Sequence, residues 1–264
     1  MPKWPLLAIA LIGVSGSAAA ANEKPVCADR PGKATPTCTV PRGKIQVETA
    51  LIDWAHDGSG HVSSDAFAIG QSALKFGLTD RLHVELDVTP FAEIKVHGGG
   101  FRDRVSGIGD SSVALKYRMT RDDASVQLAL RPFVKIPTAN HSIGNRKVEG
   151  GIALLADSSF GGSPVGWDLA PEVDLVADFD GSGYHGAIAA AASIGIPVSD
   201  QLTLSGELWG SWNFDPSHTL RQYSLDASAA LLLSPNVQVD AGVNFGLNRA
   251  TPDVEAYSGV AFRF

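Results

Sequence analysis

The chain has 264 residues, of which 44% are hydrophobic and 19% are charged, and its formal net charge is -7. This length is ample for a single domain. The negative charge gives no electrostatic support for contacts with nucleic-acid phosphates, so a nucleic-acid partner is not expected.

The N-terminal residues 1–21 have the pattern of a secretory signal peptide. Lys3 supplies a positive charge, residues 6–14 (LLAIALIGV) form a short apolar core, and residues 15–21 (SGSAAAA) offer a small-residue cleavage site. A membrane-spanning helix needs roughly 20 apolar residues, and no later run reaches that length. We therefore predict that the chain is exported and that the mature part has no membrane helix.

Residues 22–42 are predicted to form a periplasmic N-terminal arm. The arm contains both cysteines of the chain, Cys27 and Cys38. An oxidising compartment favours their pairing as a disulfide, and the alternative is two free thiols in a flexible arm. Two cysteines without a nearby histidine do not complete a tetrahedral zinc shell. Neither a metal site nor a cofactor is predicted for the chain.

Beyond Pro41, polar and apolar residues alternate in many segments. In residues 237–248 (VQVDAGVNFGLN) every second residue is apolar, and the residues between them are polar or glycine. An alternation with a period of two indicates strands whose two faces meet different environments. Similar alternation occurs in residues 82–89, 112–119, 167–175, 202–208 and 254–264.

Short turns and longer polar loops alternate between the expected strands. The short turns are expected at residues 79–81, 120–124, 161–164, 199–201 and 234–236. The longer loops are expected at residues 56–65, 96–107, 138–146, 177–185, 213–219 and 249–252. These eleven connections imply twelve strands. Strands of about ten residues or more are long for soluble sheets and suit a tilted membrane crossing.

The apolar face of these strands could fill a soluble core or could face lipid. Lipid is favoured because the polar face is rich in small residues, and because short and long connections alternate as in outer-membrane barrels. The chain also ends on Phe262 and Phe264, which is typical of the signal read by the outer-membrane assembly machinery. In hydrocarbon every backbone polar group must pair, so the sheet must close. We predict an all-β fold, a transmembrane antiparallel up-and-down β-barrel of about 12 strands formed by residues 43–264 in the bacterial outer membrane.

Three segments carry a resemblance to a known family. They are residues 107–119 (GIGDSSVALKYRM), residues 135–138 (KIPT) and residues 247–264 (LNRATPDVEAYSGVAFRF). These segments resemble the outer-membrane transporter family named for the MetA pathway of phenol degradation. The resemblance implies a β-barrel that transports small solutes, among which aromatic compounds are assigned by association.

Strand parity predicts which polar side chains point into the lumen. Charges of both signs in a narrow lumen could form a structural network of ion pairs, or they could line a path for a solute. The predicted inward residues are Lys44, Glu48, Lys75, His83, Glu85, Asp87, Asp110, Lys116, Arg118, Arg131, Lys135, Glu149, Asp168, Glu172, Asp174, Glu207, Asp226, Asp240, Asn244, Glu255 and Arg263.

The sequence offers only weak signals for chemistry. Six of the seven histidines lie in or beside the expected long loops, where neighbouring aspartates could help them to bind a metal or sense pH, but their spacings match no standard site. Ser111 and Ser142 invite comparison with an outer-membrane lipase, yet a nucleophile needs a base and an orienting group. No catalytic residue is predicted.

The favoured function is passive uptake of small solutes, aromatic or otherwise hydrophobic, through an outer-membrane channel. The expected partners are outer-membrane lipid, the barrel assembly machinery and a small-molecule solute. Two other functions stay open. One is a structural or adhesive barrel with a closed lumen, and the other is an outer-membrane lipid hydrolase.

Overall fold

A computed structural model describes residues 24–98 and 100–264. The predicted signal peptide lies outside the described residues. Within the described part, all regular secondary structure consists of β-strands, and no helix there is long and apolar enough to cross a membrane.

The fifteen strands are β1 Ile45–Ser59, β2 Val62–Ile69, β3 Ser72–Thr79, β4 Leu82–Val88, β5 Phe91–Gly98, β6 Phe101–Gly107, β7 Ser111–Arg118, β8 Gln127–Ile136, β9 Glu149–Ser159, β10 Gly166–Ala177, β11 Tyr184–Pro197, β12 Leu202–Asn213, β13 Leu220–Ser234, β14 Val237–Gly246 and β15 Val254–Arg263. Every pairing between them is antiparallel.

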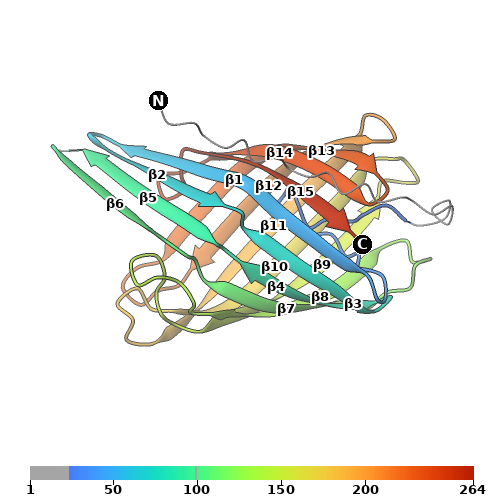
Figure 1. The fold of residues 1–264 in the computed structure, drawn as a ribbon, viewed down its shortest axis with the longest axis horizontal. Helices are drawn as coiled ribbons and strands as arrows, with labels where there is room; N and C mark the ends of the chain where they lie inside the picture. The colour runs from blue at the N-terminus through green and yellow to red at the C-terminus, as the bar shows by residue number, and fades with distance from the viewer. Residues whose placement is uncertain (1–23, 99) are drawn as a thin grey trace, which may run out of the picture.

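The strands form one sheet that closes into a barrel (Figure 1). β1 pairs along its length with β15, from Gln46 opposite Arg263 to His56 opposite Val254, and this pairing joins the two ends of the sheet. β2 with β3, β4 with β5, and β6 with β7 are each two parts of one crossing, so the fifteen strands make twelve crossings. The predicted twelve-stranded up-and-down barrel is confirmed.

The three divided crossings are interrupted side by side, at residues that disfavour a continuous ladder. Gly70 has a φ of 71°, a conformation that favours glycine. Pro90 lacks the N–H that a ladder needs. A Cβ on Gly109 would lie 2.7 Å from the Thr89 side chain. On the far side of these three interruptions, β2, β5 and β6 continue together with the second half of β1 past the ends of the other strands (Figure 1).

This four-stranded extension corrects two predictions. Residues 56–65 and 96–107 were expected to be polar loops, but they belong almost entirely to strands. Arg102, Asp103 and Arg104 of β6 are exposed, and in the described residues the ladder of β6 is with β5 alone. Because hydrocarbon tolerates neither free ladder groups nor such charges, this part of β6 lies outside the membrane. The polar composition of residues 56–65 and 96–107 therefore indicates that they are exposed to solvent, and it does not indicate that their backbone is irregular.

The barrel has its apolar side chains outside and its charged side chains inside. Leu208 and Glu207 are neighbours on β12, and Leu208 is 59% exposed whereas Glu207 is 5% exposed. Lys116 on β7 is completely buried, and Leu115 beside it is 43% exposed. A water-soluble barrel would show the opposite pattern, so the lipid-facing assignment agrees with the structure.

Candidate functional site in the barrel lumen

Residues 24–44, called here the lumen segment, run inside the barrel. Val26 donates its backbone N–H to Pro235 in the short turn between β13 and β14, at 2.7 Å, and Gly43 donates to Gly77 at 2.8 Å. Both ends of the segment therefore lie at the short-turn end of the barrel. The sequence pattern indicates an arm in the periplasm and gives no sign of this position.

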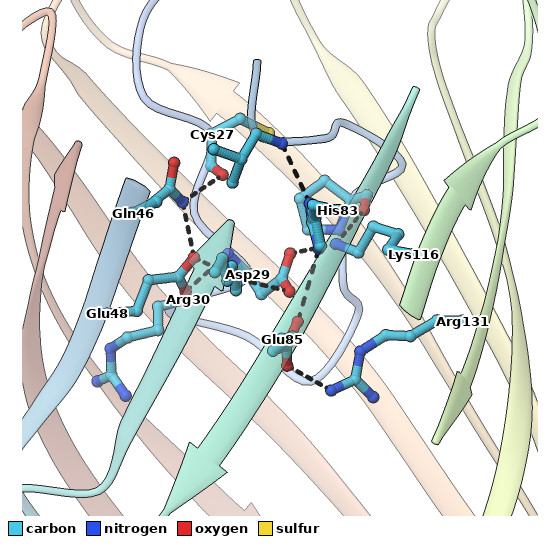
Figure 2. Close-up of polar contacts among 12 residues, drawn as sticks. Cys27, Asp29, Arg30, Gln46, Glu48, His83, Glu85, Lys116 and Arg131 are labelled. Carbon is cyan, nitrogen blue, oxygen red and sulfur yellow. Dashed lines mark hydrogen bonds and ion pairs between the residues drawn. The ribbon is translucent and has the colours of Figure 1, made fainter. Parts of the chain in front are cut away.

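A disulfide closes the lumen segment into a loop. It joins Cys27 and Cys38, whose Cα atoms are 6.3 Å apart. The chain between them reaches into the lumen and returns, as the close-up of the polar contacts shows (Figure 2). The cross-link restricts the conformations that residues 28–37 can adopt once they leave the wall.

One wall of the lumen presents two lysines to Asp29. Lys75 of β3 and Lys116 of β7 are 1% and 0% exposed, and both ammonium groups bond the Asp29 carboxylate, Lys75 at 2.7 Å. Burial raises the pKa of Asp29, but the lysine charges lower it further, and the result is a pKa of about 2 instead of 3.8. Lys75 also pairs with Glu48 of β1. The segment thus supplies one carboxylate that both buried lysines share.

The opposite wall, from β12 to β15, is acidic and receives two cations from the segment. Arg30 bonds Asp240 of β14 at 2.9 Å. The Lys33 ammonium lies 3.3 Å from Asp226 of β13 and 3.6 Å from Glu255 of β15. Charges of the segment therefore match charges of the barrel on both sides of the lumen.

Backbone amides of the segment are also bonded to the wall. Glu207 of β12 accepts the N–H groups of Lys33 and Ala34, at 2.9 and 2.7 Å. His83 of β4 accepts the N–H of Val40 through Nδ1, at 3.1 Å. Because buried backbone groups are costly when unpaired, these contacts fix the path of the segment.

Glycines give the segment room against the wall. A Cβ on Gly259 of β15 would lie 2.4 Å from the Arg30 side chain, and a Cβ on Gly32 would lie 2.7 Å from the Glu207 carboxylate. The small residues of the inward face, which are typical of a narrow lumen, here accommodate a second layer of chain.

The twenty-one predicted inward residues are all buried or half-buried. Nine contact the segment directly: Glu48, Lys75, His83, Lys116, Glu207, Asp226, Asp240, Glu255 and Arg263. Of the other twelve, Lys44 belongs to the segment itself, and the rest lie on the barrel strands or next to them: Glu85, Asp87, Asp110, Arg118, Arg131, Lys135, Glu149, Asp168, Glu172, Asp174 and Asn244. Among these, Arg131 bonds Glu85 at 2.6 Å (Figure 2), and Lys135 bonds Asp110 at 2.9 Å.

Three residues of the segment were missed from the sequence. Asp29, Arg30 and Lys33 make the central contacts, but none belongs to an alternating strand. Their signal was a cluster of both charge signs (DRPGK) between two cysteines, which composition alone does not distinguish from a solvated loop.

Two cavities flank the lumen segment. One of about 550 Å³ lies beside Cys38 and Pro41, towards Arg118 and Asp168. The other, of about 390 Å³, lies between the segment and β10 to β14. Both are within the range of small-molecule sites, roughly 300–1,000 Å³.

In the described residues, the contacts of the two serines that invite comparison with a lipase do not match those of a nucleophile. The Ser111 hydroxyl oxygen accepts a hydrogen bond of 2.9 Å from the Thr138 hydroxyl. In residues 24–98 and 100–264, the structure has no hydrogen bond between a histidine and Ser111 or Ser142. A base in contact with the nucleophile is what such chemistry requires.

Comparison with known proteins agrees with the barrel. Residues 28–264 match the protein family described as "Putative MetA-pathway of phenol degradation", and no curated protein sequence matches the chain significantly. An outer membrane channel from Pseudomonas putida F1 has a TM-score of 0.66 at 17% identity, covering 89% of this chain and 99% of that chain. The translocator domain of the autotransporter NalP from Neisseria meningitidis has a TM-score of 0.53 at 10% identity, covering 85% and 90%. The β-domain of the Bordetella autotransporter BrkA has a TM-score of 0.52 at 12% identity, covering 84% and 100%. At these identities the likeness concerns the fold.

Proposed function

The chain belongs to the family of the MetA pathway of phenol degradation, and on that premise we propose that it is a channel for passive diffusion of small, mainly apolar solutes, with the lumen segment as its gate. By fold and family the chain is an outer-membrane β-barrel. Export through the predicted signal peptide, insertion by the assembly machinery and uptake of aromatic solutes are parts of this proposal.

The observation that carries the proposal is how the lumen is filled. A closed structural barrel would be expected to fill its interior with interlocking wall side chains. Here the interior holds a loop, whose central contacts are ion pairs and hydrogen bonds of Asp29, Arg30 and Lys33. Ion pairs can be exchanged for water at modest net cost, so the segment can leave without disrupting the sheet.

The lining of the lumen suits a mainly apolar solute. Ala129, Ala153, Leu155 and Ala170 form a buried apolar cluster on β8, β9 and β10. Trp209 of β12 lies against a small cavity next to Lys33, whose ammonium is 5.6 Å from the centre of the indole ring. An apolar strip beside charged walls can pass a ring-sized solute while water hydrates the charges.

The proposal is tested by uptake of a labelled aromatic hydrocarbon such as toluene into Gram-negative cells. Cells that carry the protein should take up toluene faster than cells with the empty vector, whereas glucose uptake should not change. The folded barrel is quantified in both by its heat-dependent gel mobility. Equal toluene rates with and without the protein would contradict the channel and would favour a barrel with a closed lumen.

A further inference from the structure

The long-loop end of the barrel brings together three side chains that are separate in the sequence. Asp178 follows β10, His185 is at the start of β11, and Asp215 follows β12. The nearest donor atoms of the three lie within 4.8 Å of one another. The His185 Nδ1 is 2.7 Å from Asp178 Oδ1 and 3.7 Å from Asp215 Oδ2.

From this geometry we propose that Asp178, His185 and Asp215 bind a divalent transition-metal ion of the Zn²⁺ type at the outer mouth of the barrel. A tetrahedral ion with ligand bonds of about 2.0–2.1 Å keeps its ligand atoms roughly 3.3 Å apart. The two observed distances bracket that value. Three protein ligands leave one position for water, and this proposal is independent of the transport function.

The orientation of the imidazole fits a metal ligand. The Nε2 atom of His185 is 2.5 Å from the amide oxygen of Asn213. Since that oxygen can only accept, Nε2 carries the proton, and Nδ1 is the atom that faces the two carboxylates. Metal-bound histidines commonly donate their other N–H to an oxygen in this way, which fixes the ring.

The charges of the cluster also call for a cation. Asp215 and His185 side chains are 2% and 7% exposed, and Asp178 is 11% exposed. In the described part of the chain, His185 is the only basic side chain in an ion pair with either carboxylate. Even a protonated imidazole leaves one negative charge uncompensated, whereas a divalent ion on neutral His185 balances both carboxylates. Buried charges of this kind are costly unless they are compensated.

The loops hold the Asp215 carboxylate in place independently of His185. Asp215 accepts the backbone N–H of Phe179 through Oδ2 at 2.7 Å and that of Ser217 through Oδ1 at 2.8 Å. The first of these bonds ties the β10–β11 loop to the β12–β13 loop. A bound ion would therefore join two external loops and the start of β11 at the channel mouth.

The ligand set selects the type of ion. Imidazole with carboxylates suits Zn²⁺ and related transition metals, whereas Ca²⁺ prefers a larger set of oxygen ligands. The sequence does not predict a metal site, because Asp178, His185 and Asp215 have no recognisable spacing. Antiparallel strands with loops at one barrel end bring them together.

The test is isothermal titration of the untagged, detergent-purified protein with Zn²⁺ after treatment with EDTA. We expect one Zn²⁺ per chain, with Ca²⁺ binding at least about tenfold weaker. His185→Ala and Asp215→Asn should each weaken Zn²⁺ binding at least about tenfold, and Asn213→Ala should weaken it roughly 10- to 100-fold. His61→Ala removes an exposed histidine from another turn and should leave the affinity within about twofold.

Folding of each variant is checked by heat-dependent gel mobility, and Co²⁺ provides an independent signal. Co²⁺ bound by the wild type should give visible absorption bands that His185→Ala lacks. Absence of Zn²⁺ binding, or binding that survives both His185→Ala and Asp215→Asn, would overturn the proposal. His185 would then be a protonated side chain that only links the two loops.

Discussion

Replacement of Asp29 by Asn should release the lumen segment. The carboxylate bonds both Lys75 and Lys116, which are almost fully buried. Breaking a buried ion pair by removing one partner costs about 3–5 kcal/mol. Glu48 still pairs with Lys75 in the variant, so we expect about 2–4 kcal/mol after discounting that figure. This raises the ratio of withdrawn to seated segment roughly 30- to 700-fold, because each 1.4 kcal/mol is a factor of ten.

Single-channel recording in planar bilayers measures this change as open probability. The matched control is Asp122→Asn, which removes the same charge from an exposed carboxylate that pairs with Lys24 and Arg118; the Asp122 side chain is 57% exposed. Such pairs contribute about 0–1 kcal/mol, so the control should change the open probability by at most about fivefold. Equal opening in the two variants, or no opening with Asp29→Asn, would refute the idea that this buried contact holds the gate.

The pH dependence of this effect has a defined sign. The folded-state pKa of Asp29 is about 2, below its ordinary 3.8. The stabilisation by this group is therefore fully present above pH 3.8 and is lost as the pH falls through 2. The ratio of open probabilities, Asp29→Asn over wild type, should stay constant from pH 7 to about pH 5, begin to fall near pH 4 and continue to fall until about pH 2. A ratio that does not change as the pH falls from 5 to 2 would mean that the lysines do not lower the pKa of Asp29 in the seated segment.

Three further predictions concern other parts of the chain. Replacing Cys27 and Cys38 by Ser should raise the open probability, since disulfides typically contribute about 2–4 kcal/mol. A reducing agent should raise the open probability of the wild type and leave that of the variant unchanged. Unchanged gating in the variant would show that the cross-link does not restrain the lumen segment. Leu208→Arg should destabilise the barrel by about 2–4 kcal/mol in urea unfolding from lipid vesicles. Ser193→Arg, at a position that pairs with the neighbouring Glu207 and lies beside a lumen cavity, should cost less, and equal costs would contradict the assignment of faces. Deletion of Phe264, whose backbone N–H bonds Ile45 at the barrel seam at 2.8 Å, should lower the amount of folded protein in the outer membrane, and normal amounts would argue against its role in assembly.

Much of the fold could be predicted from local patterns. In residues 237–248, apolar residues alternate with polar residues or glycine without interruption. In β14 the polar residues of this pattern face the lumen and the apolar residues face outward, as the alternation predicts. The same held for Glu207 and Leu208 on β12. The lengths of the first two external loops were wrong, because strands that continue beyond the membrane meet water on both faces and lose the alternation.

Only the wall residues of the candidate site could be predicted from the sequence, and their partners in the lumen segment could not. Strand parity identified the wall residues Lys116, Asp240 and Glu255, but it could not show what they contact. Their partners Asp29 and Lys33 come from a stretch without periodicity, and nothing local distinguishes a loop in water from one inside a barrel.

The order of residues along the chain thus determined the strands, their faces and the closure of the sheet, because a side-chain period of two is a property of neighbouring residues and an open edge is excluded in lipid. Only the tertiary structure decided that residues 24–44 enter the lumen and that Asp178, His185 and Asp215 meet at its mouth. Both depend on distances across the closed barrel, which are set by how all twelve crossings are arranged around the lumen.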